Sequence, residues 1–380
     1  MKIIVCSPYH PPHIGGLEKY NEELFSHLAA KGHSITIVTS NIPWGNVIEK
    51  KGNITVIRFP ALDIIYNYPI PNIFSPVFWK LFYMVKTEQF DIIFSATRFF
   101  ISTPIALIMG KIRKIPWIHI EHGSGYVISN NLLVAPIGRI YDACIAPFLF
   151  KHTSLTIAPS NSAQQFIKTF DQRKTPVIYR GVEYNNIAAI APNSALKELY
   201  RGHTIITYVG RLISGKGLPD LFHAIAAIPQ TTPIVLLLVG SGQERTELEV
   251  LQTNLHLDTR VRFLGALSHD ESIGVMKISD IVVNPSYSEG LPTTILEAIT
   301  CKTSVIATNV GGTAEILSPE LSWFLYKPGD IASLTEKIQT LIMDASLRMK
   351  FSSVASPYIK QKFNWKSAAS EYESHMKALV

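Results

Sequence analysis

Cysteine is scarce in this sequence. The 380 residues include only Cys6, Cys144 and Cys301, and no two of them form a Cys-x-x-Cys pair. Disulfide-bonded domains and zinc sites need several cysteines at close spacing. The composition therefore argues against a disulfide framework and against a metal site of this kind, and it favours a reducing cytoplasm.

Long apolar runs are missing as well. A membrane-spanning helix needs about 20 consecutive apolar residues, but the most apolar stretches are interrupted by Arg98 and Pro104 and by Arg139 and Asp142. The apolar start over residues 1–6 is shorter than the core of a signal peptide and is typical of a first strand. We expect a cytoplasmic protein that is soluble or, at most, peripheral on the inner face of the membrane.

The sequence also lacks a nucleic-acid-binding motif. Lysine and arginine are spread along the chain, and the formal net charge of +6 suits nucleotides or phospholipid headgroups as anionic partners. Nucleic acid is therefore not an expected partner.

Apolar residues, by contrast, make up 47% of the chain, which is enough for two α/β domains. Two regions repeat one β-loop-α-β order: residues 3–38, with Gly15 and Gly16 in the loop, and residues 204–239, with the loop at 210–217. Their uninterrupted aliphatic strands are typical of parallel sheets covered on both faces. The pattern predicts two doubly wound domains that face each other, with the ligand cleft at the carboxyl ends of the strands.

The segment between these regions predicts where the domains meet. Residues 184–194 contain three asparagines and a proline with weak apolar periodicity, as in a linker. We predict an N-terminal domain over residues 1–185 and a C-terminal domain over 186–360. A last helix over 361–380 is expected to pack back towards the N-terminal domain.

Two glutamates follow a predicted strand at 280–283. Glu289 lies in the loop after this strand, and Glu297 lies in the next helix. Backbone N–H groups around Gly290 and Leu291 can bind hydroxyls or anions. One carboxylate could hold a sugar ring and the other a ribose; alternatively, both are ordinary surface residues.

The loop at 210–217 carries two cations, Arg211 and Lys216. A diphosphate needs cations that reach both phosphates, and a planar guanidinium with a mobile ammonium group meets that need. The loop is not a Walker A motif. Alternatively, Arg211 and Lys216 are surface residues without a role in ligand binding.

Glycines in two other loops give weaker signals. Gly15 and Gly16 precede a helix, where small residues let phosphate oxygens approach its positive end. Gly240 follows the strand at 234–239 and leaves room for the chain to pass a ligand. A plain tight turn explains each of them equally well.

One histidine ends a predicted strand. His122, after Ile118-His-Ile-Glu, could hydrogen-bond a sugar hydroxyl or stabilise charge. A buried histidine with satisfied hydrogen bonds is the alternative. His119 and Glu121 point to the other side of the strand and are expected to be structural.

Together these segments resemble glycosyltransferase family 4, whose members have the GT-B arrangement of two Rossmann-like domains. The resemblance rests on Gly15-Gly-Leu-Glu18, Gly32-His33, Glu121-His-Gly123, Arg180-Gly-Val-Glu183, Gly210-Arg211, Lys216-Gly217, Gly240-Ser-Gly242, Gly311-Gly312 with Glu315, and above all Glu289-x7-Glu297. Two segments depart from the family pattern. Arg180-Gly-Val-Glu183 stands where Asn-Gly-Val-Asp is common, and Cys301-Lys-Thr-Ser-Val305 stands where Cys-Gly-x-Pro-Val is common.

The resemblance implies a retaining glycosyltransferase that needs no metal and no cofactor besides its nucleotide-sugar donor, such as a UDP- or GDP-sugar. It implies that Arg211, Lys216 and the Gly15-Gly16 loop hold the diphosphate. Glu297 would bind ribose and Glu289 the transferred sugar, with His122 near the reacting face and backbone near Leu264 at the base. The absence of an Asp-x-Asp motif agrees with metal independence, because the two cations can offset leaving-group charge.

The acceptor is expected to be a glycan or a lipid-linked molecule, in the synthesis of cell-surface polysaccharide or glycolipid. Residues 64–79 are unusually aromatic, and Lys80, Lys86, Lys111, Arg113 and Lys114 follow them. This combination suggests a surface for anionic lipid or a lipid-linked acceptor. An ordinary core segment would explain the aromatic residues as well.

Other functions compete with this one. A sugar-nucleotide epimerase of the same fold and a noncatalytic glycosyltransferase-like binding partner both remain open. A nicotinamide-dependent dehydrogenase is disfavoured because no G-x-G-x-x-G follows the first strand. A phosphorylase is disfavoured because no lysine has the sequence context of a pyridoxal site.

Overall fold

The computed structural model describes residues 1–13, 15–42, 44–65, 68–126 and 134–380. The chain forms two compact units. The first contains Met1–Tyr126, Pro136–Gly181 and Asn364–Val380, and the second contains Val182–Phe363. Both ends of the chain therefore belong to the same unit.

The first unit is built on a seven-stranded sheet with the order β3-β4-β2-β1-β7-β8-β9. Its strands are β1 (Lys2–Cys6), β2 (Ser34–Ser40), β3 (Ile48–Lys51), β4 (Ile54–Phe59), β7 (Ile92–Ala96), β8 (Trp117–Ile120) and β9 (Leu155–Ile157). All neighbours are parallel except β3 with β4. A separate antiparallel pair consists of β5 (Ala61–Ile65) and β6 (Tyr68–Pro71). Tyr66 and Asn67, in the predicted aromatic segment, lie outside the described residues.

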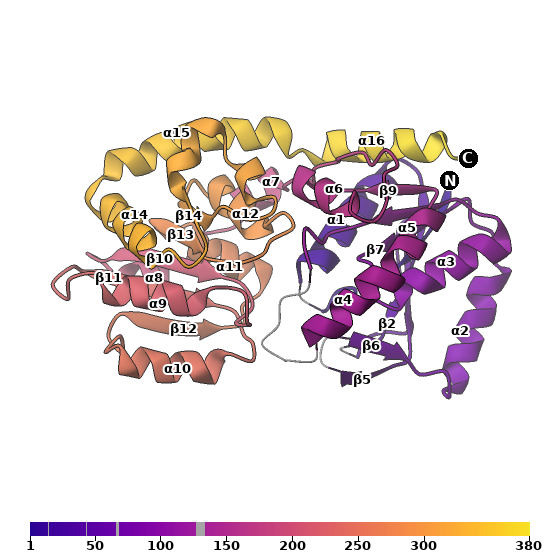
Figure 1. Ribbon diagram of the computed structural model, residues 1–380, viewed down its shortest axis with the longest axis horizontal. Coiled ribbons are helices and arrows are strands. Elements are labelled where there is room, and N and C mark those ends of the chain that lie inside the picture. The colour runs from indigo at the N-terminus through magenta and orange to yellow at the C-terminus, as the bar shows by residue number, and fades with distance from the viewer. Residues whose placement is uncertain (14, 43, 66–67, 127–133) are drawn as a thin grey trace. The chain divides into compact units, whose positions relative to one another are not determined.

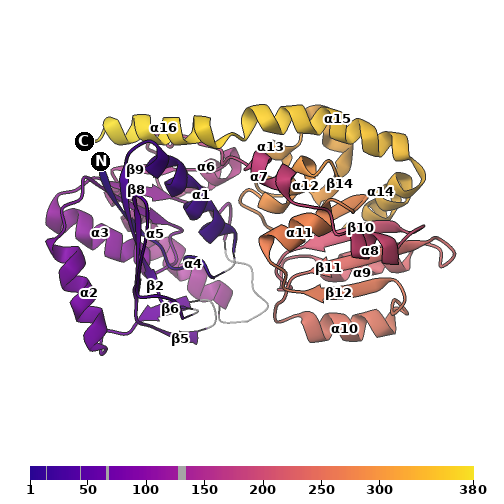
Figure 2. The ribbon, with the colours of Figure 1, turned by 180° about the vertical axis from the view of Figure 1, so that it is seen from behind.

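Helices cover both faces of this sheet (Figures 1 and 2). They are α1 (Gly16–Ala30), α2 (Pro76–Thr87), α3 (Ser102–Arg113), α4 (Val134–Cys144), α5 (Ala146–His152), α6 (Asn161–Ile167) and α16 (Trp365–Lys377). Helices α1 and α16 share one core with the strands, while α2, α3 and α5 contribute to a second. Tyr20, Leu24 and Leu28, which are spaced as on one face of a helix, are buried on α1.

Helix α16 packs against α1 within the first unit. The hydroxyls of Tyr20 and Tyr372 are 2.7 Å apart in the core. Trp365 Nε1 donates to a carboxylate oxygen of Glu23 at 3.0 Å. The last helix is thus an integral part of the N-terminal core.

The second unit has a six-stranded, fully parallel sheet with the order β12-β11-β10-β13-β14-β15. The strands are β10 (Thr204–Val209), β11 (Ile234–Val239), β12 (Val261–Gly265), β13 (Ile281–Asn284), β14 (Ser304–Thr308) and β15 (Leu325–Tyr326). Since all strands run the same way, the loops that follow them lie along one edge of the sheet. The two doubly wound sheets confirm the predicted α/β class.

Helices surround this second sheet. They are α7 (Tyr184–Ala189), α8 (Ser194–Leu199), α9 (Leu218–Ala226), α10 (Arg245–Asn254), α11 (His269–Met276), α12 (Thr293–Thr300), α13 (Thr313–Ile316), the 3-10 helix η1 (Pro319–Phe324), α14 (Ile331–Met343) and α15 (Ala345–Lys362). The expected linker is in part helical. Helix α7 packs against α12 and buries Ile187, which explains why residues with weak periodicity are ordered there. None of the helices in the described ranges is long and apolar enough to cross a membrane.

Candidate active site

The loops after β10 and β13 are in direct backbone contact at one edge of the six-stranded sheet. The N–H of Tyr287 donates to the carbonyl oxygen of Gly215 at 2.8 Å. Gly217 has φ +65, and a Cβ atom there would lie 2.0 Å from the carbonyl oxygen of Pro285. A side chain cannot fit in that space, so this glycine lets the two loops meet.

The loop after β11 joins the same contact. A Cβ atom on Gly240, which has φ +140, would lie 1.8 Å from the carbonyl oxygen of Gly210. A Cβ atom on Gly242 would lie 2.2 Å from the carbonyl oxygen of Leu212. Close packing of the backbone therefore accounts for these glycines.

Two of the predicted residues form an ion pair across these loops. Lys216 Nζ lies 2.7 Å from Glu289 Oε1, and both side chains are mostly buried. Arg211 lies at the start of the same loop as Lys216, and its side chain is exposed. The carbonyl oxygen of Arg211 accepts a hydrogen bond from the Tyr208 hydroxyl at 2.9 Å. The structure thus places Arg211, Lys216 and Glu289 at one edge of the sheet.

Glu297 is buried in the middle of α12, where it pairs with a histidine. Its Oε1 lies 2.9 Å from Nε2 of His269, the first residue of α11. His269 was not identified as a site residue from the sequence. It follows the end of β12, just as Arg211 follows β10 and Glu289 follows β13. Leu264 lies near the end of β12 and is partly buried against a core cluster.

The turn before α12 is tied to the loop after β14. The N–H of Gly312 donates to the carbonyl oxygen of Gly290 at 2.9 Å. Leu291 is half-buried next to it, and Pro292 is the N-cap residue of α12. This turn is therefore held on both sides by loops of the same edge.

In the first unit, Gly15, the N-cap residue of α1, lies beside a carboxylate. A Cβ atom on Gly15 would be 2.3 Å from an Oε atom of Glu18, whereas Gly16 has open space. Glu18 is buried and its Oε1 lies 2.8 Å from His13 Nδ1. A carboxylate of the chain itself thus lies near the helix end where phosphate oxygens were expected.

His122 is a half-buried residue that contacts α1. Its ring meets that of Tyr20 edge-on, with 4.6 Å between ring centroids. Its Nε2 atom is buried and has no hydrogen-bond partner among the described residues. Burial lowers the pKa of His122 to about 4, so the imidazole is neutral near pH 7.

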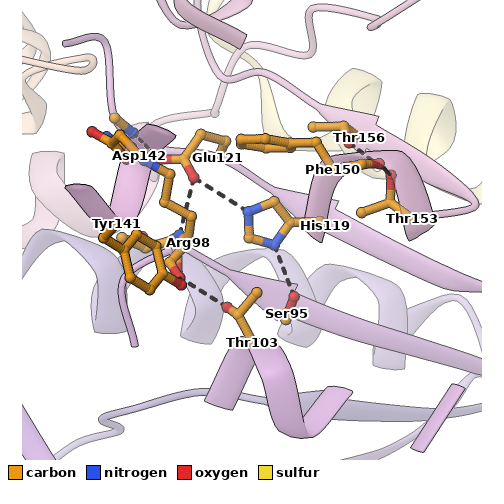
Figure 3. A network of polar contacts seen from close by, with 12 residues as sticks. Ser95, Arg98, Thr103, His119, Glu121, Tyr141, Asp142, Phe150, Thr153 and Thr156 are labelled. Atoms are coloured by element: carbon orange, nitrogen blue, oxygen red, sulfur yellow. Dashed lines mark hydrogen bonds and ion pairs between the residues drawn. The ribbon is translucent and has the colours of Figure 1, made fainter. Parts of the chain in front are cut away.

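A buried charge network surrounds Glu121, the residue before His122 (Figure 3). Arg98 Nη1 donates to Glu121 Oε1 at 3.0 Å, and Arg98 Nε donates to Asp142 Oδ1 at 2.7 Å. All three side chains are at most 1% exposed. Burial alone would raise the pKa of Glu121, but hydrogen bonding from His119 and the charge of Arg98 bring it down to about 2.

The network holds the segment that carries His122. Glu121 Oε1 also accepts the N–H of Gly123 at 2.7 Å, and Glu121 Oε2 accepts the N–H of Arg98 at 3.0 Å. One carboxylate therefore joins the loop after β7 to the loop after β8. His119 and Glu121 lie on the same side of β8, as predicted, whereas Arg98 and Asp142 were not identified.

Comparison with protein families matches both halves of the chain. Residues 14–186 match the model for Glycosyltransferase Family 4, and residues 193–356 match that for Glycosyl transferases group 1. A glycosyltransferase of Methanocaldococcus jannaschii is 32% identical over 100% of this chain and 99% of its own length. The N-acetyl-alpha-D-glucosaminyl L-malate synthase of Bacillus anthracis is 23% identical over 96% of this chain and 94% of its own length. A component of the human phosphatidylinositol N-acetylglucosaminyltransferase is 25% identical over 98% of this chain and 75% of its own length.

Solved structures share the fold. Sucrose-phosphate synthase from Thermosynechococcus elongatus has a TM-score of 0.82 at 23% identity, with 100% of this chain and 98% of that chain covered. The Anabaena protein HepE in complex with UDP-glucose has a TM-score of 0.80 at 22% identity, with both chains fully covered. Both comparisons extend over the two units.

Proposed function

This chain belongs to glycosyltransferase family 4 and has the GT-B fold, and on that basis we propose that it transfers a sugar from a nucleotide-diphosphate sugar. One observation carries the proposal. The cation-bearing loop after β10 is packed backbone to backbone against the loop after β13, and Lys216 pairs with Glu289 across them. A diphosphate binds cations, and the hydroxyls of its attached sugar can donate hydrogen bonds to a carboxylate.

The ion pair suggests how the donor is taken up. Lys216 and Glu289 neutralise each other across the two loops. We propose that the diphosphate draws Lys216 and the exposed Arg211 to its oxygens, which leaves Glu289 to accept hydrogen bonds from the sugar hydroxyls. The backbone N–H groups near Gly290 and Leu291 are proposed to assist.

Glu297 is proposed to bind the ribose hydroxyls. It is buried beside His269, which limits how the carboxylate can turn. Gly240, which follows β11, and the backbone near Leu264, at the end of β12, are proposed to line the rest of the nucleotide site. The base itself would be read largely by backbone groups.

The transfer is proposed to retain anomeric configuration without a metal ion. Arg211 and Lys216 would offset the charge that develops on the leaving diphosphate, and the leaving phosphate would help to deprotonate the acceptor on the same face. Neutral His122 suits a hydrogen bond to a hydroxyl better than proton transfer near pH 7. For Gly15 to contact phosphate, the Glu18 carboxylate would have to move, whereas Gly16 has open space.

The acceptor is proposed to be a glycan or a lipid-linked molecule, in cell-surface polysaccharide or glycolipid synthesis. The name of the human relative, which refers to phosphatidylinositol, supports a lipid-linked acceptor. The UDP-glucose complex of HepE supports a UDP-sugar as the donor. No other cofactor is proposed.

A thermal-shift experiment with nucleoside diphosphates tests the donor site. A ligand at 100 times its dissociation constant stabilises the folded state by about 2.7 kcal/mol. We expect UDP or another nucleoside diphosphate to raise the unfolding temperature, and Lys216→Ala to abolish this rise. Lys197→Ala, which removes an exposed lysine from α8, is the matched control and should retain it.

Activity assays then separate the alternatives. NMR of the product measures whether the anomeric configuration is retained. We expect transfer with retained configuration to persist in the presence of a metal chelator. Nucleotide binding without transfer to any acceptor would favour a noncatalytic binding partner, and isomerisation of the donor sugar would favour an epimerase. No stabilisation by any nucleoside diphosphate would refute the proposed site.

A further inference from the structure

Helices α2, α3, α4 and α5 form an outer layer on one face of the first unit's sheet (Figures 1 and 2). Leu81 of α2, Leu107 of α3 and Leu149 of α5 are buried in one core, and Tyr141 of α4 packs against it. Because these side chains face the sheet, the opposite sides of the helices face outward. We call this outward side the α2–α5 surface.

The α2–α5 surface is apolar where a soluble helix would be polar. On α3, Ile105, Ile108 and Ile112 follow helical spacing opposite the buried stripe, and Ile112 is 76% exposed. Fourteen exposed large apolar side chains lie on these helices and in the turns next to them: Ile73, Phe74, Val77, Trp79, Phe82, Tyr83, Met84, Ile105, Ile108, Ile112, Ile137, Ile140, Ile145 and Phe148. Such a concentration marks an interaction site.

The second unit provides a contrast. Only five of its described residues are large exposed hydrophobics, and they lie on separate elements: Leu199, Val250, Tyr287, Met343 and Met349. The apolar character of the α2–α5 surface is therefore not a general property of this chain.

The charge on this surface has one sign. Exposed cations lie among the apolar residues: Lys80, Lys86, Lys111, Lys114, Arg139 and Lys151. The ammonium group of Lys111 lies 5.3 Å from the ring centroid of Phe148, which ties α3 to α5. The four helices contain a single acidic residue, Asp142, and it is buried with Arg98; Glu88 and Asp91 lie in the link between α2 and β7.

We propose that the α2–α5 surface docks on a lipid bilayer that contains anionic lipids. Aromatic and aliphatic side chains would enter the boundary between headgroups and acyl chains, while the lysines and arginines extend to the headgroups. The bilayer is favoured over a second copy of the chain because a symmetric contact of this surface with itself would bring like charges together. The helices would lie on the membrane and not cross it.

This surface includes part of the one suggested by the sequence and extends beyond it. Within the aromatic segment, Tyr68 and Ile70 are half-buried, and large apolar residues become exposed from Ile73 onward. The stripe on α3 and the exposed isoleucines of α4 were not identified, because short apolar helices resemble core helices until their exposure is known.

Vesicle binding by the full-length protein tests the proposal without reference to catalysis. Vesicles of phosphatidylcholine alone are compared with vesicles of equal parts phosphatidylcholine and phosphatidylglycerol, in low and high salt. We expect co-sedimentation with the anionic vesicles in low salt, and weaker binding in high salt because added ions screen the headgroups. The protein should bind far less to vesicles of phosphatidylcholine alone.

Two double variants locate the contact. We expect Ile108→Glu with Ile112→Glu, and Lys80→Glu with Lys86→Glu, each to weaken vesicle binding by about tenfold or more. Met343→Glu with Met349→Glu places the same charges on exposed residues of the second unit and should leave binding unchanged. Circular dichroism and the unfolding temperature verify that each variant is folded.

Three outcomes would overturn the proposal. They are no binding to anionic vesicles in low salt, equal loss of binding in the control variant, and formation of a dimer in solution that Ile108→Glu with Ile112→Glu disrupts. Stabilisation by nucleoside diphosphate, measured on the same variants, tests the donor site separately. Failure of one proposal is thus distinguishable from failure of the other.

Discussion

Gly217 is one of the residues on which the packing of the proposed donor-site loops depends directly. It has a left-handed backbone, and any Cβ atom there would lie only 2.0 Å from the carbonyl oxygen of Pro285. We expect Gly217→Ala to destabilise the second unit by about 2–4 kcal/mol, because both backbone strain and a backbone clash are introduced. Denaturant unfolding measures the loss.

Gly215 offers a control two residues away. Its φ of +86 imposes the same backbone strain, but a Cβ atom there meets nothing within 4 Å. Gly215→Ala should therefore cost only about 1 kcal/mol. Equal losses for the two variants would contradict the claim that contact with Pro285 is what requires glycine at position 217.

Residue chemistry determined which parts of the site could be predicted. Lys216 and Glu289 were found from the sequence because each lies in a loop at a strand end, where charged side chains are conspicuous. His269 and Arg98 were missed because their ion pairs depend on tertiary packing. The partner of His269 is 28 residues away in the sequence, and the two partners of Arg98 are 23 and 44 residues away. The roles assigned to the site residues remain predictions.

At the scale of elements, one carboxylate joins the loops after β7 and β8. Glu121 accepts hydrogen bonds from Arg98 and from the N–H of Gly123, next to His122. Replacing the charged carboxylate with an amide weakens these hydrogen bonds, although Arg98 keeps its ion pair with Asp142. We expect Glu121→Gln to destabilise the protein by about 1.5–3 kcal/mol near neutral pH.

This loss should depend on pH in a defined direction. The pKa of Glu121 is depressed to about 2, so its charged form stabilises the folded state above the ordinary glutamate pKa. That contribution is lost as pH falls from about 4.5 towards about 2. Denaturant unfolding across this range should show the difference between wild type and Glu121→Gln becoming smaller.

Glu49→Gln provides the comparison. Glu49 pairs with Arg58 at 3.0 Å, but its side chain is 50% exposed. An exposed pair contributes roughly 0–1 kcal/mol, so this variant should differ little from wild type at any pH. A pH-independent penalty for Glu121→Gln would contradict the ionised state assigned to Glu121.

Among the elements, regular strands were the most predictable. The aliphatic runs at 204–209 and 234–239 predict β10 and β11 at the bounds that the structure has, because parallel strands buried on both faces need continuous apolar sequence. Helix α7 and the exposed side of α3 were not predictable in this way. Both depend on what a short helix contacts, which its own sequence does not specify.

At the scale of the whole molecule, the N-terminal core is completed by the last residues of the chain. Trp365, Tyr372 and Met376 of α16 are at most 3% exposed and share one core with Ile3 and Leu24. Burial of a large apolar side chain contributes roughly 1.5–3 kcal/mol. Loss of all three is comparable to the total stability of a domain, about 5–15 kcal/mol.

We therefore expect a chain that ends at Phe363 to lose the fold of the first unit while the second unit stays folded. Hydrogen exchange measured by mass spectrometry should show β1, β2 and β7 unprotected, and β10 and β11 protected as in the full chain, because amides exchange only where the structure opens. Removal of Val380 alone, which is 66% exposed, should change neither set. Protection of β1 in the chain that ends at Phe363 would show that α16 is dispensable, and loss of protection in β10 would show that the two units do not fold independently.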